Sequence, residues 1–236
     1  MESAFKSFAE CVRYWKTVVE YTAGSFFGEP SKMPGLSFNI PASLCKVGAI
    51  LRERKGSVCE HCYARKGRYV FPGVQHAMNA RLAFTRHPLF VQAMVSLLST
   101  AQRQCKGFVP FFRFHDSGDI QSREHGNAIA DIARSLPSIS FWLPTKEYSH
   151  AREIEKIAPV NLCIRVSNAM VEHDSFNSKL LSRDSYPNQS TVWKRGFVRE
   201  LVDGEVFCPA PKNDGKCGDC RACWNRDVFR IVYREH

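Results

Sequence analysis

The fold is decided by residues 109–166, which read VPFFRFHDSGDIQSREHGNAIADIARSLPSISFWLPTKEYSHAREIEKIAPVNLCIRV. Short apolar runs rich in aromatic and β-branched residues alternate here with longer stretches whose apolar residues recur every three or four positions. The short runs predict strands at 109–115, 139–144 and 160–166, and the longer stretches predict helices at 122–135 and 149–158. Ser149 is the expected N-cap of the second helix. Strand and helix therefore alternate along this stretch.

The residues before this stretch extend the same pattern. Apolar side chains at three- and four-residue steps predict an amphipathic helix at 2–22, with Cys11 beside its buried face. A first strand is expected at 36–41, and an interrupted helical region is expected at 75–104. Because alternating strands and helices form right-handed parallel units, we expect an α/β fold that is a small or partial (β/α) barrel.

Polar residues follow each of the four expected strands, at the edge where barrels of this kind place functional groups. They are Asn39 and Cys45 after the first strand, His115 to Asp119 after the second, Thr145-Lys146-Glu147 after the third, and Arg165-Val166-Ser167-Asn168 after the fourth. An ordinary polar loop explains any one of these groups equally well.

The candidate catalytic residues are His115, Asp116 and Lys146. His115 and Asp116 are adjacent, and adjacent residues on a strand point to opposite faces of a sheet. They can therefore act as an acid–base pair only if the strand has ended before them. Otherwise His115 is a residue of the pocket wall.

Composition places the chain among ordinary globular proteins. Its 236 residues are 44% hydrophobic, no apolar run approaches the ~20 residues that cross a bilayer, and the first residues lack the apolar region of a secretory signal. We therefore expect a cytoplasmic protein without membrane contact. No sequence motif supports a serine hydrolase, a P-loop protein or a dinucleotide-binding protein.

Ten cysteines in a reducing compartment are candidate metal ligands rather than disulfide partners. Cys45, Cys59 and Cys62 form a first group, with thirteen and then two residues between them. Three thiolates leave one iron of a [4Fe–4S] cluster open to a substrate or cofactor, and we expect such a cluster here. A zinc site, for which His61 is poorly placed as a fourth ligand, and unligated buried thiols are the alternatives.

A second group has eight, two and two residues between its members, which are Cys208, Cys217, Cys220 and Cys223. Closely spaced cysteines of this kind resemble ferredoxin-type ligation and predict a second [4Fe–4S] cluster. A structural zinc site uses the same four-thiolate set, so the spacing leaves the metal open. Cys105 and Cys163 fit neither group and are expected in the core.

Three parts are expected along the chain. They are an N-terminal helix packed on the core at 1–30, the partial barrel with the three-cysteine site at 31–206, and a cysteine-rich metal-binding segment at 207–236. The 33 basic and 23 acidic residues give a net charge of +10, which favours a polyanionic partner such as a nucleotide or nucleic acid. General solubility accounts for this charge equally well.

A first strand followed by three cysteines, with Cys62-Tyr63 closing a Cys-x-x-Cys pair at the start of a barrel, resembles the radical S-adenosylmethionine superfamily. In that superfamily the first cysteine spacing is usually three residues rather than thirteen. A second resemblance is carried by the stretches CEHCYARKG at 59–67, FRFHDSGD at 112–119, FWLPTKE at 141–147 and CGDCRACW at 217–224. Through them most of residues 30–236 resemble the gene-88 family of phage proteins, which implies a location in the host cytoplasm.

The superfamily resemblance implies that the open iron binds the amino and carboxylate groups of S-adenosylmethionine, and that one-electron reduction cleaves this cofactor to a 5′-deoxyadenosyl radical. Implied cofactor contacts are Ser117, Gly118 and Asp119 at the methionine amino group, Arg165, Ser167 and Asn168 at the carboxylate and ribose, and Tyr63, Arg113 and Lys146 around them. The resemblance further implies a small barrel of about six strands, an auxiliary cluster at the second cysteine group and an electron donor protein such as flavodoxin or ferredoxin.

The alternative function is that of a nucleic-acid-binding or host-interaction protein whose zinc or iron–sulfur sites only hold loops in place. The C-terminal segment mixes basic and aromatic residues as contacts to single-stranded nucleic acid do. These residues are Lys212, Lys216, Arg221, Trp224 and Arg226. A solvated face around a metal loop explains the same mixture. The sequence therefore favours an iron–sulfur enzyme and keeps the binding protein as its rival.

Overall fold

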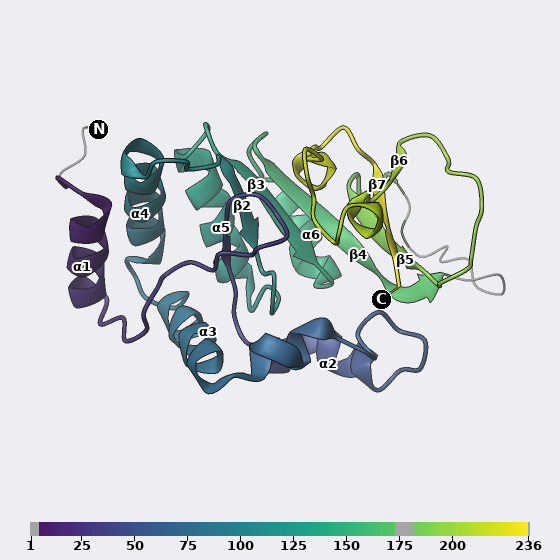
Figure 1. Cartoon of the computed structure of the whole chain (residues 1–236), viewed down its shortest axis with the longest axis horizontal. Helices are drawn as coiled ribbons and strands as arrows, with labels where there is room; N and C mark the ends of the chain where they lie inside the picture. Colours follow the sequence, from purple (N-terminus) through teal and green to yellow (C-terminus); the bar gives the residue numbers. More distant parts are fainter. Residues whose placement is uncertain (1–4, 173–180, 182, 236) are drawn as a thin grey trace.

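Seven strands form the centre of the computed structural model, which describes residues 5–172, 181 and 183–235. Within these residues the strand order is β1-β2-β3-β4-β5-β7-β6, and all neighbouring pairs are parallel (Figure 1). The strands are Leu36–Phe38 (β1), Phe111–Phe114 (β2), Ser140–Thr145 (β3), Leu162–Glu172 (β4), Gln189–Trp193 (β5), Glu205–Phe207 (β6) and Arg230–Arg234 (β7). In the described ranges β1 and β6 are edges, so the sheet is open, as in a partial α/β barrel.

Helices cover one face of the sheet, because the strands place large apolar side chains on that face. Phe38 of β1, Phe112 and Phe114 of β2 and Phe141 of β3 lie in the main core. Helices α4, α5 and α6 follow one another along this face, and α1 packs on the outer side of α4 (Figure 1). The helices are Phe8–Val18 (α1), Lys46–Arg52 (α2), Pro72–Phe84 (α3), Phe90–Gln104 (α4), Arg123–Ser135 (α5) and Tyr148–Glu155 (α6).

The C-terminal segment covers the opposite face of β2 and β3. Trp142 of β3 lies in a second apolar cluster with Cys223, Trp224 and Ile231. The indole N–H of Trp224 also donates a hydrogen bond of 3.0 Å to the backbone oxygen of Phe112. Both faces of the sheet are therefore covered at β2 and β3, as the burial of a parallel sheet requires.

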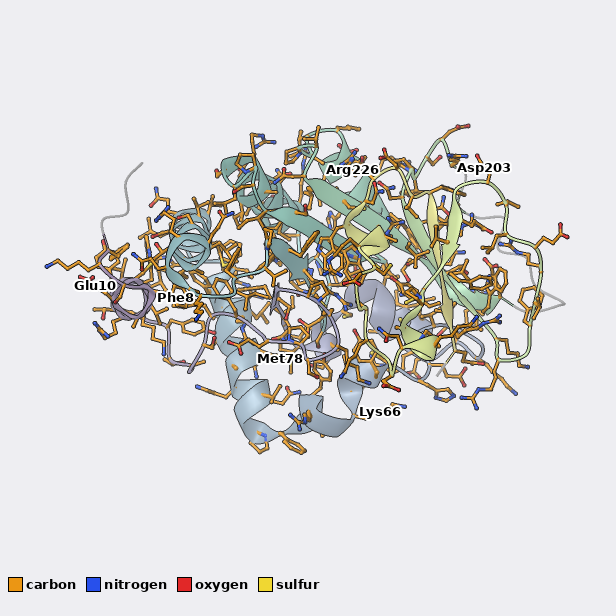
Figure 2. All side chains as sticks on the ribbon, turned by 45° about the horizontal axis from the view of Figure 1, so that its top comes forward. Phe8, Glu10, Lys66, Met78, Asp203 and Arg226 are labelled. Carbon is orange, nitrogen blue, oxygen red and sulfur yellow. The ribbon has the colours of Figure 1, made fainter. Side chains whose placement is uncertain are left out.

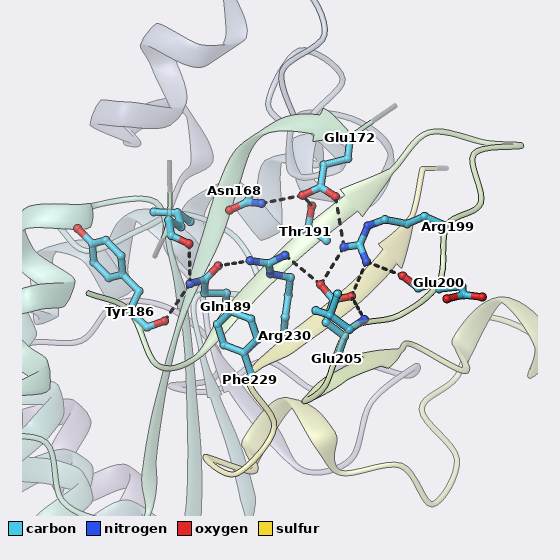
Figure 3. Close-up of polar contacts among 12 residues, drawn as sticks. Asn168, Glu172, Tyr186, Gln189, Thr191, Arg199, Glu200, Glu205, Phe229 and Arg230 are labelled. Carbon is cyan, nitrogen blue, oxygen red and sulfur yellow. Dashed lines mark hydrogen bonds and ion pairs between the residues drawn. The ribbon is translucent and has the colours of Figure 1, made fainter. Parts of the chain in front are cut away.

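A network of charged residues joins the last strands of the sheet, as Figure 3 shows. Glu205 of β6 is buried and accepts bonds of 2.7 and 2.8 Å from Arg199 and one of 2.9 Å from Arg230 of β7. Glu172, at the end of β4, accepts a bond of 2.8 Å from Thr191 of β5. Because two guanidinium groups offset two buried carboxylates, the network holds β6 and β7 in place without leaving a buried charge unpaired.

The predicted alternation of strands and helices is confirmed, and β1 to β4 overlap the four predicted strands. The sheet has seven strands in the described residues rather than about six, and β5, β6 and β7 are added to the four strands whose positions were predicted. β7 comes from the segment 207–236 and lies between β5 and β6, inside the main sheet. No helix in the described part of the chain is long and apolar enough to cross a membrane.

Two local predictions are wrong. Helix α6 begins at Tyr148, one residue before Ser149, and its cap position makes no side-chain bond. Cys105 is half-buried instead of lying in the core, because it follows the last turn of α4. Cys11 and Cys163 are buried as predicted. The predicted start of the first helix, residues 2–4, lies outside the described residues.

Candidate functional site

The first cysteine group lies on the segment between β1 and α3. Cys45 directly precedes α2, and Cys59 and Cys62 lie in the turn before a short 3-10 helix. The start of α2 is bonded to the end of β3, since the backbone N–H of Val47 donates to the carboxylate of Glu147 over 3.0 Å. This bond places the group at the carboxyl edge of the sheet.

The thirteen-residue spacer between Cys45 and Cys59 is held against the end of β4. Two backbone bonds of 2.9 Å join Val58 N–H to the oxygen of Ala169 and Val171 N–H to the oxygen of Gly56. The spacer therefore has a defined position in the fold, and it returns Cys59 and Cys62 to the same edge as Cys45.

The three thiols of this group influence one another. Burial, with smaller contributions from the negative charges of Asp119, Cys62 and Cys59, raises the pKa of the Cys45 thiol to about 12, and Lys146 opposes this rise. Burial also raises the pKa of Cys59, and the positive charge of Lys146 again opposes it. The three thiols, the Lys146 ammonium and the Asp119 carboxylate thus belong to one site.

Gly48 of α2 keeps space open beside two of these thiols. A β-carbon at this position would lie 2.9 Å from Cβ of Cys45 and 3.7 Å from the sulfur atoms of both Cys45 and Cys59. Glycine inside a helix costs roughly 0.5–1 kcal/mol relative to alanine, so the helix itself gains nothing from it. The glycine leaves a cradle between α2 and the sulfurs that a side chain would fill.

The loop 115–119, which follows β2, is bonded to the end of β1. The backbone N–H of His115 donates to Phe38 over 2.7 Å, and Ser117 exchanges two bonds of 3.0 Å with Ile40, one of them from its hydroxyl. Gly118 has a φ of 87°, and a β-carbon there would lie 2.7 Å from the backbone oxygen of Ile40. Only glycine fits this position, so the backbone of the loop is fixed against β1.

The carboxylate of Asp119 is buried and fully bonded within the fold. It accepts bonds of 2.6 Å from the Thr145 hydroxyl, 2.9 Å from the backbone N–H of Lys146 and 2.8 Å from that of Ile120. Burial raises the pKa of this carboxyl to about 6, although the three bonds oppose the rise. Asp119 thus ties the loop after β2 to the loop after β3.

Asp116 keeps part of its bonding capacity free. Its Oδ2 accepts bonds of 3.1 Å from Asn39 and 2.9 Å from the Tyr69 hydroxyl, while Oδ1 is buried without a partner in the described residues. Buried Arg81 of α3 donates to the side-chain oxygen of Asn39, and the Tyr63 hydroxyl donates to the backbone oxygen of Asp116. Tyr69 and Arg81 were not predicted, because an aromatic residue and a helical arginine carry no signal before the fold brings them together.

Lys146 and Ser167, predicted after β3 and β4, are brought together. The Lys146 ammonium donates a bond of 2.8 Å to the Ser167 hydroxyl. Tyr148 donates from its hydroxyl to the backbone oxygen of Ser167 over 3.0 Å. Because Lys146 also acts on Cys59, this pair lies beside the first cysteine group.

Arg113 of β2 lies between the two cysteine groups. Its guanidinium donates to the Tyr63 hydroxyl over 3.3 Å and lies 4.3 Å from the centre of the Trp142 ring. Tyr63 directly follows Cys62 of the first group. In the second group, burial raises the pKa of Cys217 and the positive charge of Arg113 opposes the rise. Both groups therefore face the region around this side chain.

The four cysteines of the second group surround one small cavity. Its lining consists of Cys208, Cys217, Cys220 and Cys223 with Phe207, Pro209, Ala222, Trp224 and Ile231. The backbone N–H of Cys208 donates to Val232 over 2.9 Å, and that of Cys217 donates to Lys32 over 2.8 Å. Burial raises the pKa of Cys223 to about 12. The four cysteines therefore line one apolar space that is anchored to β7.

Arg165 of β4, predicted as a cofactor contact, lies beneath the second cysteine group. Its side chain is 0% exposed and donates only to backbone oxygens and to the sulfur of Cys163. The oxygens belong to Gln189, Ala222, Cys223, Asn225, Val228 and Phe229, at 2.9 to 3.5 Å. No carboxylate forms an ion pair with Arg165 in the described part of the chain. This guanidinium holds the loop that carries Cys223.

His115 and Asn168 are buried but not bonded to the first cysteine group. The His115 ring lies 5.2 Å from the His125 ring of α5, and both of its nitrogens lack a partner among the described residues. Burial lowers its pKa well below the usual value, so the ring is neutral. β2 ends at Phe114, as an acid–base pair with Asp116 requires, yet no described hydrogen bond joins the two side chains. Asn168 donates to Glu172 over 3.1 Å.

The described side chains form no preassembled site for a single metal ion. Within residues 5–172, 181 and 183–235, no three His, Cys, Asp or Glu side chains converge on one metal ion. Zinc holds thiolates at about 2.3 Å, and hence about 3.8 Å from one another. Instead, two thiols of the first group border the cradle at Gly48, and four thiols surround a cavity in the second. Three and four cysteines are the numbers that hold an open and a closed [4Fe–4S] cluster.

The fold and the site define a parallel α/β protein with two cysteine groups. One lies at the carboxyl edge of the sheet, and the other lies on the face opposite the helices. The model of the family described as Gene product 88 matches residues 16–226, and the chain belongs to this family. This match confirms the resemblance to the gene-88 family of phage proteins. No curated protein and no solved structure matches the chain.

Proposed function

We propose that this protein is an iron–sulfur enzyme that cleaves S-adenosylmethionine reductively to start radical chemistry on a substrate. The observation that supports it most is the position of the first cysteine group. Cys45, Cys59 and Cys62 lie together at the carboxyl edge of a parallel sheet, beside the loops that follow β2 and β3. Parallel α/β proteins gather their reactive groups at this edge.

Cys45, Cys59 and Cys62 would hold a [4Fe–4S] cluster with one iron free of protein ligands. When bound, such a cluster supplies an electron to S-adenosylmethionine, whose cleavage provides a 5′-deoxyadenosyl radical that takes a hydrogen atom from the substrate. The second group would hold a closed cluster through Cys208, Cys217, Cys220 and Cys223, inside the apolar cavity that they line.

The neighbouring side chains would orient S-adenosylmethionine rather than react with it. Lys146 presents a cation and Ser167 a hydroxyl beside the first group, which suits the carboxylate and the ribose. The Ser117 hydroxyl and the Asp119 carboxylate are already bonded within the fold, so the contact to the methionine amino group falls to the backbone of Gly118. The free oxygen of Asp116 is a buried acceptor for a further donor of the bound molecule.

The proposal is tested by measuring iron, zinc and acid-labile sulfide in protein purified without oxygen. We expect about eight irons and about eight sulfides per chain, absorption that bleaches with dithionite, and 5′-deoxyadenosine when the reduced protein meets S-adenosylmethionine. Zinc without sulfide would mean that the metal sites are structural, and it would overturn the proposed enzyme. Intact clusters that release no 5′-deoxyadenosine under strong reduction would also overturn the proposal.

A substitution at Gly48 distinguishes an effect on the stability of helix α2 from an effect on the binding of the cluster. Gly48→Ala is expected to change the free energy of unfolding of the metal-free protein by no more than ~1 kcal/mol, because alanine favours the helix while its β-carbon, 2.9 Å from Cβ of Cys45, forces a small shift there. The added methyl group fills the cradle beside Cys45 and Cys59, so about half of the iron should be lost. Urea unfolding and iron analysis measure the two effects.

Gly73 of α3 provides the matched control, since a β-carbon there meets no atom within 4 Å. Gly73→Ala should change neither the iron nor the sulfide content. Full iron in the Gly48→Ala protein would show that the cradle holds no cluster.

A further inference from the structure

A strongly basic surface lies next to the first cysteine group. The segment 44–71 has seven basic and two acidic residues, so it carries half of the net charge of +10. Its exposed cations, which we call the basic surface, are Lys46, Arg54, Lys55, Arg65, Lys66 and Arg68. None of them forms an ion pair in the ranges that the structure describes. Figure 1 shows this segment, in blue, outside the layer of α4 to α6, and Figure 2 labels Lys66 at its margin.

Two aromatic rings lie open among these cations. Phe71 is 58% exposed and Tyr63 is 49% exposed. The Tyr63 hydroxyl is bonded to Arg113 and to the backbone of Asp116, which fixes the ring in its exposed position. Phe71 directly follows the short helix Gly67–Val70, three residues after Arg68. Exposed rings beside free cations are the combination that stacks bases and neutralises phosphates.

A second set of cations lies across Arg113 from the basic surface. Arg113 contacts the Tyr63 hydroxyl at 3.3 Å on one side and the sulfur of Met33 at 3.9 Å on the other. Lys32, next to Met33, is exposed, and so are Lys212 and Lys216 of the loop beside Cys217. Lys32 is joined to this loop by a backbone bond from Cys217. Positive charge therefore flanks both cysteine groups on either side of Arg113.

We propose that the basic surface binds single-stranded nucleic acid and presents one of its nucleotides to the first cysteine group. The second half of this inference rests on the proposed function, whereas the binding does not. Unpaired cations would contact the phosphates, and Phe71 and Tyr63 would stack on bases. An acidic protein would use the cations without the rings, and the bases of a double helix are not free to stack on them. The rings thus favour a single strand.

The binding is tested with a fluorescein-labelled oligothymidylate and oligouridylate of twelve nucleotides, using the cluster-loaded protein and fluorescence anisotropy. Removing three cations with Arg65→Gln, Lys66→Gln and Arg68→Gln should weaken binding roughly 100-fold at 0.1 M salt and lower the salt slope by about 2, since each single-strand phosphate contributes about 0.7. The control triple variant, Arg13→Gln, Arg103→Gln and Lys106→Gln, removes the same charge from α1, α4 and the turn after α4. Equal losses in both variants would mean that only net charge matters and would overturn the site.

Phe71 tests the choice of a single strand over an acidic protein. Phe71→Leu keeps an apolar side chain and removes the stacking ring, so binding should weaken about five- to 150-fold. A second variant, Phe71→Ala, should show the same loss. Wild-type binding by the leucine variant would overturn stacking. Polyglutamate that competes as well as unlabelled oligonucleotide, or a duplex that binds as tightly as the single strand, would assign the surface to another partner.

The two proposals fail in different measurements. Missing iron and sulfide, with oligonucleotide binding intact, removes the enzyme and leaves the nucleic-acid site. Loaded clusters that release 5′-deoxyadenosine, with no oligonucleotide binding, remove the site and leave the enzyme. If both hold, the triple variant at Arg65, Lys66 and Arg68 should still cleave S-adenosylmethionine, because these side chains are exposed and none is a proposed cluster or cofactor contact.

Discussion

Replacing Cys59 by alanine is expected to abolish the formation of 5′-deoxyadenosine while leaving the chain folded. Two thiols cannot hold the first cluster, so the loss should exceed the ~10–100-fold that follows from changing a residue behind a metal ligand. The fold should survive, because Val58 is bonded to β4 through its backbone and Cys59 is only half-buried. The measurements are iron content, which should fall by about half, 5′-deoxyadenosine and urea unfolding.

Cys105 supplies the control for this substitution. It is half-buried like Cys59 but belongs to neither cysteine group, so Cys105→Ala should keep all of the iron and the full activity. If Cys59→Ala unfolds the region instead, the metal is structural, since metal binding and folding are then the same event. That outcome would favour a binding protein over an enzyme.

Arg165→Gln is expected to lower the free energy of unfolding by about 3–5 kcal/mol and to empty the second cysteine group. The Arg165 guanidinium donates hydrogen bonds to backbone oxygens between Ala222 and Phe229. A buried carbonyl group that loses its donor destabilises the fold by roughly 1–3 kcal/mol. Glutamine replaces only a small part of these bonds. Urea unfolding measures the stability, and iron analysis should show about four irons remaining in the first group.

Arg165→Lys separates the bonds of this side chain from its charge. Lysine keeps the charge but has no planar fork, so its stability should lie between that of the wild type and that of Arg165→Gln. Exposed Arg86, which forms no ion pair in the described residues, is the control, and Arg86→Gln should change the free energy of unfolding by less than ~0.5 kcal/mol. Wild-type stability for Arg165→Lys would mean that charge alone matters. Full iron in Arg165→Gln would show that the loop holds its cluster without this side chain.

Arg165 also explains why a negative centre would suit the second group. Its charge is buried without a carboxylate partner in the described residues, and an isolated buried charge is costly. Four thiolates around a cluster carry net negative charge close to Cys223, which Arg165 contacts through the backbone. The protein should therefore be more stable with this site loaded than empty.

The order of strands could be predicted as far as β4 because a predicted helix of regular period lies between each pair of consecutive predicted strands there. β6 and β7 have no such signal. β6 is three residues long and β7 five, and no helix is predicted between them. Beside their backbone pairing, they are joined through Glu205, which accepts bonds from Arg199, six residues away, and from Arg230, twenty-five residues away. Pairing between distant charges has no local pattern, so the order β5-β7-β6 could not be predicted.

By itself, the sequence determined the alternation of strands and helices, the two cysteine groups and the polar strand ends, because these depend on residue type and short-range spacing. Only the tertiary structure decided which side chains serve the fold. It assigned Arg165 to a backbone loop, bonded Asp119 to the next strand, and set Gly48 beside the thiols of Cys45 and Cys59. The physical reason is that a polar side chain takes whichever partner lies within about 3 Å, and that partner is brought there by the packing of distant segments.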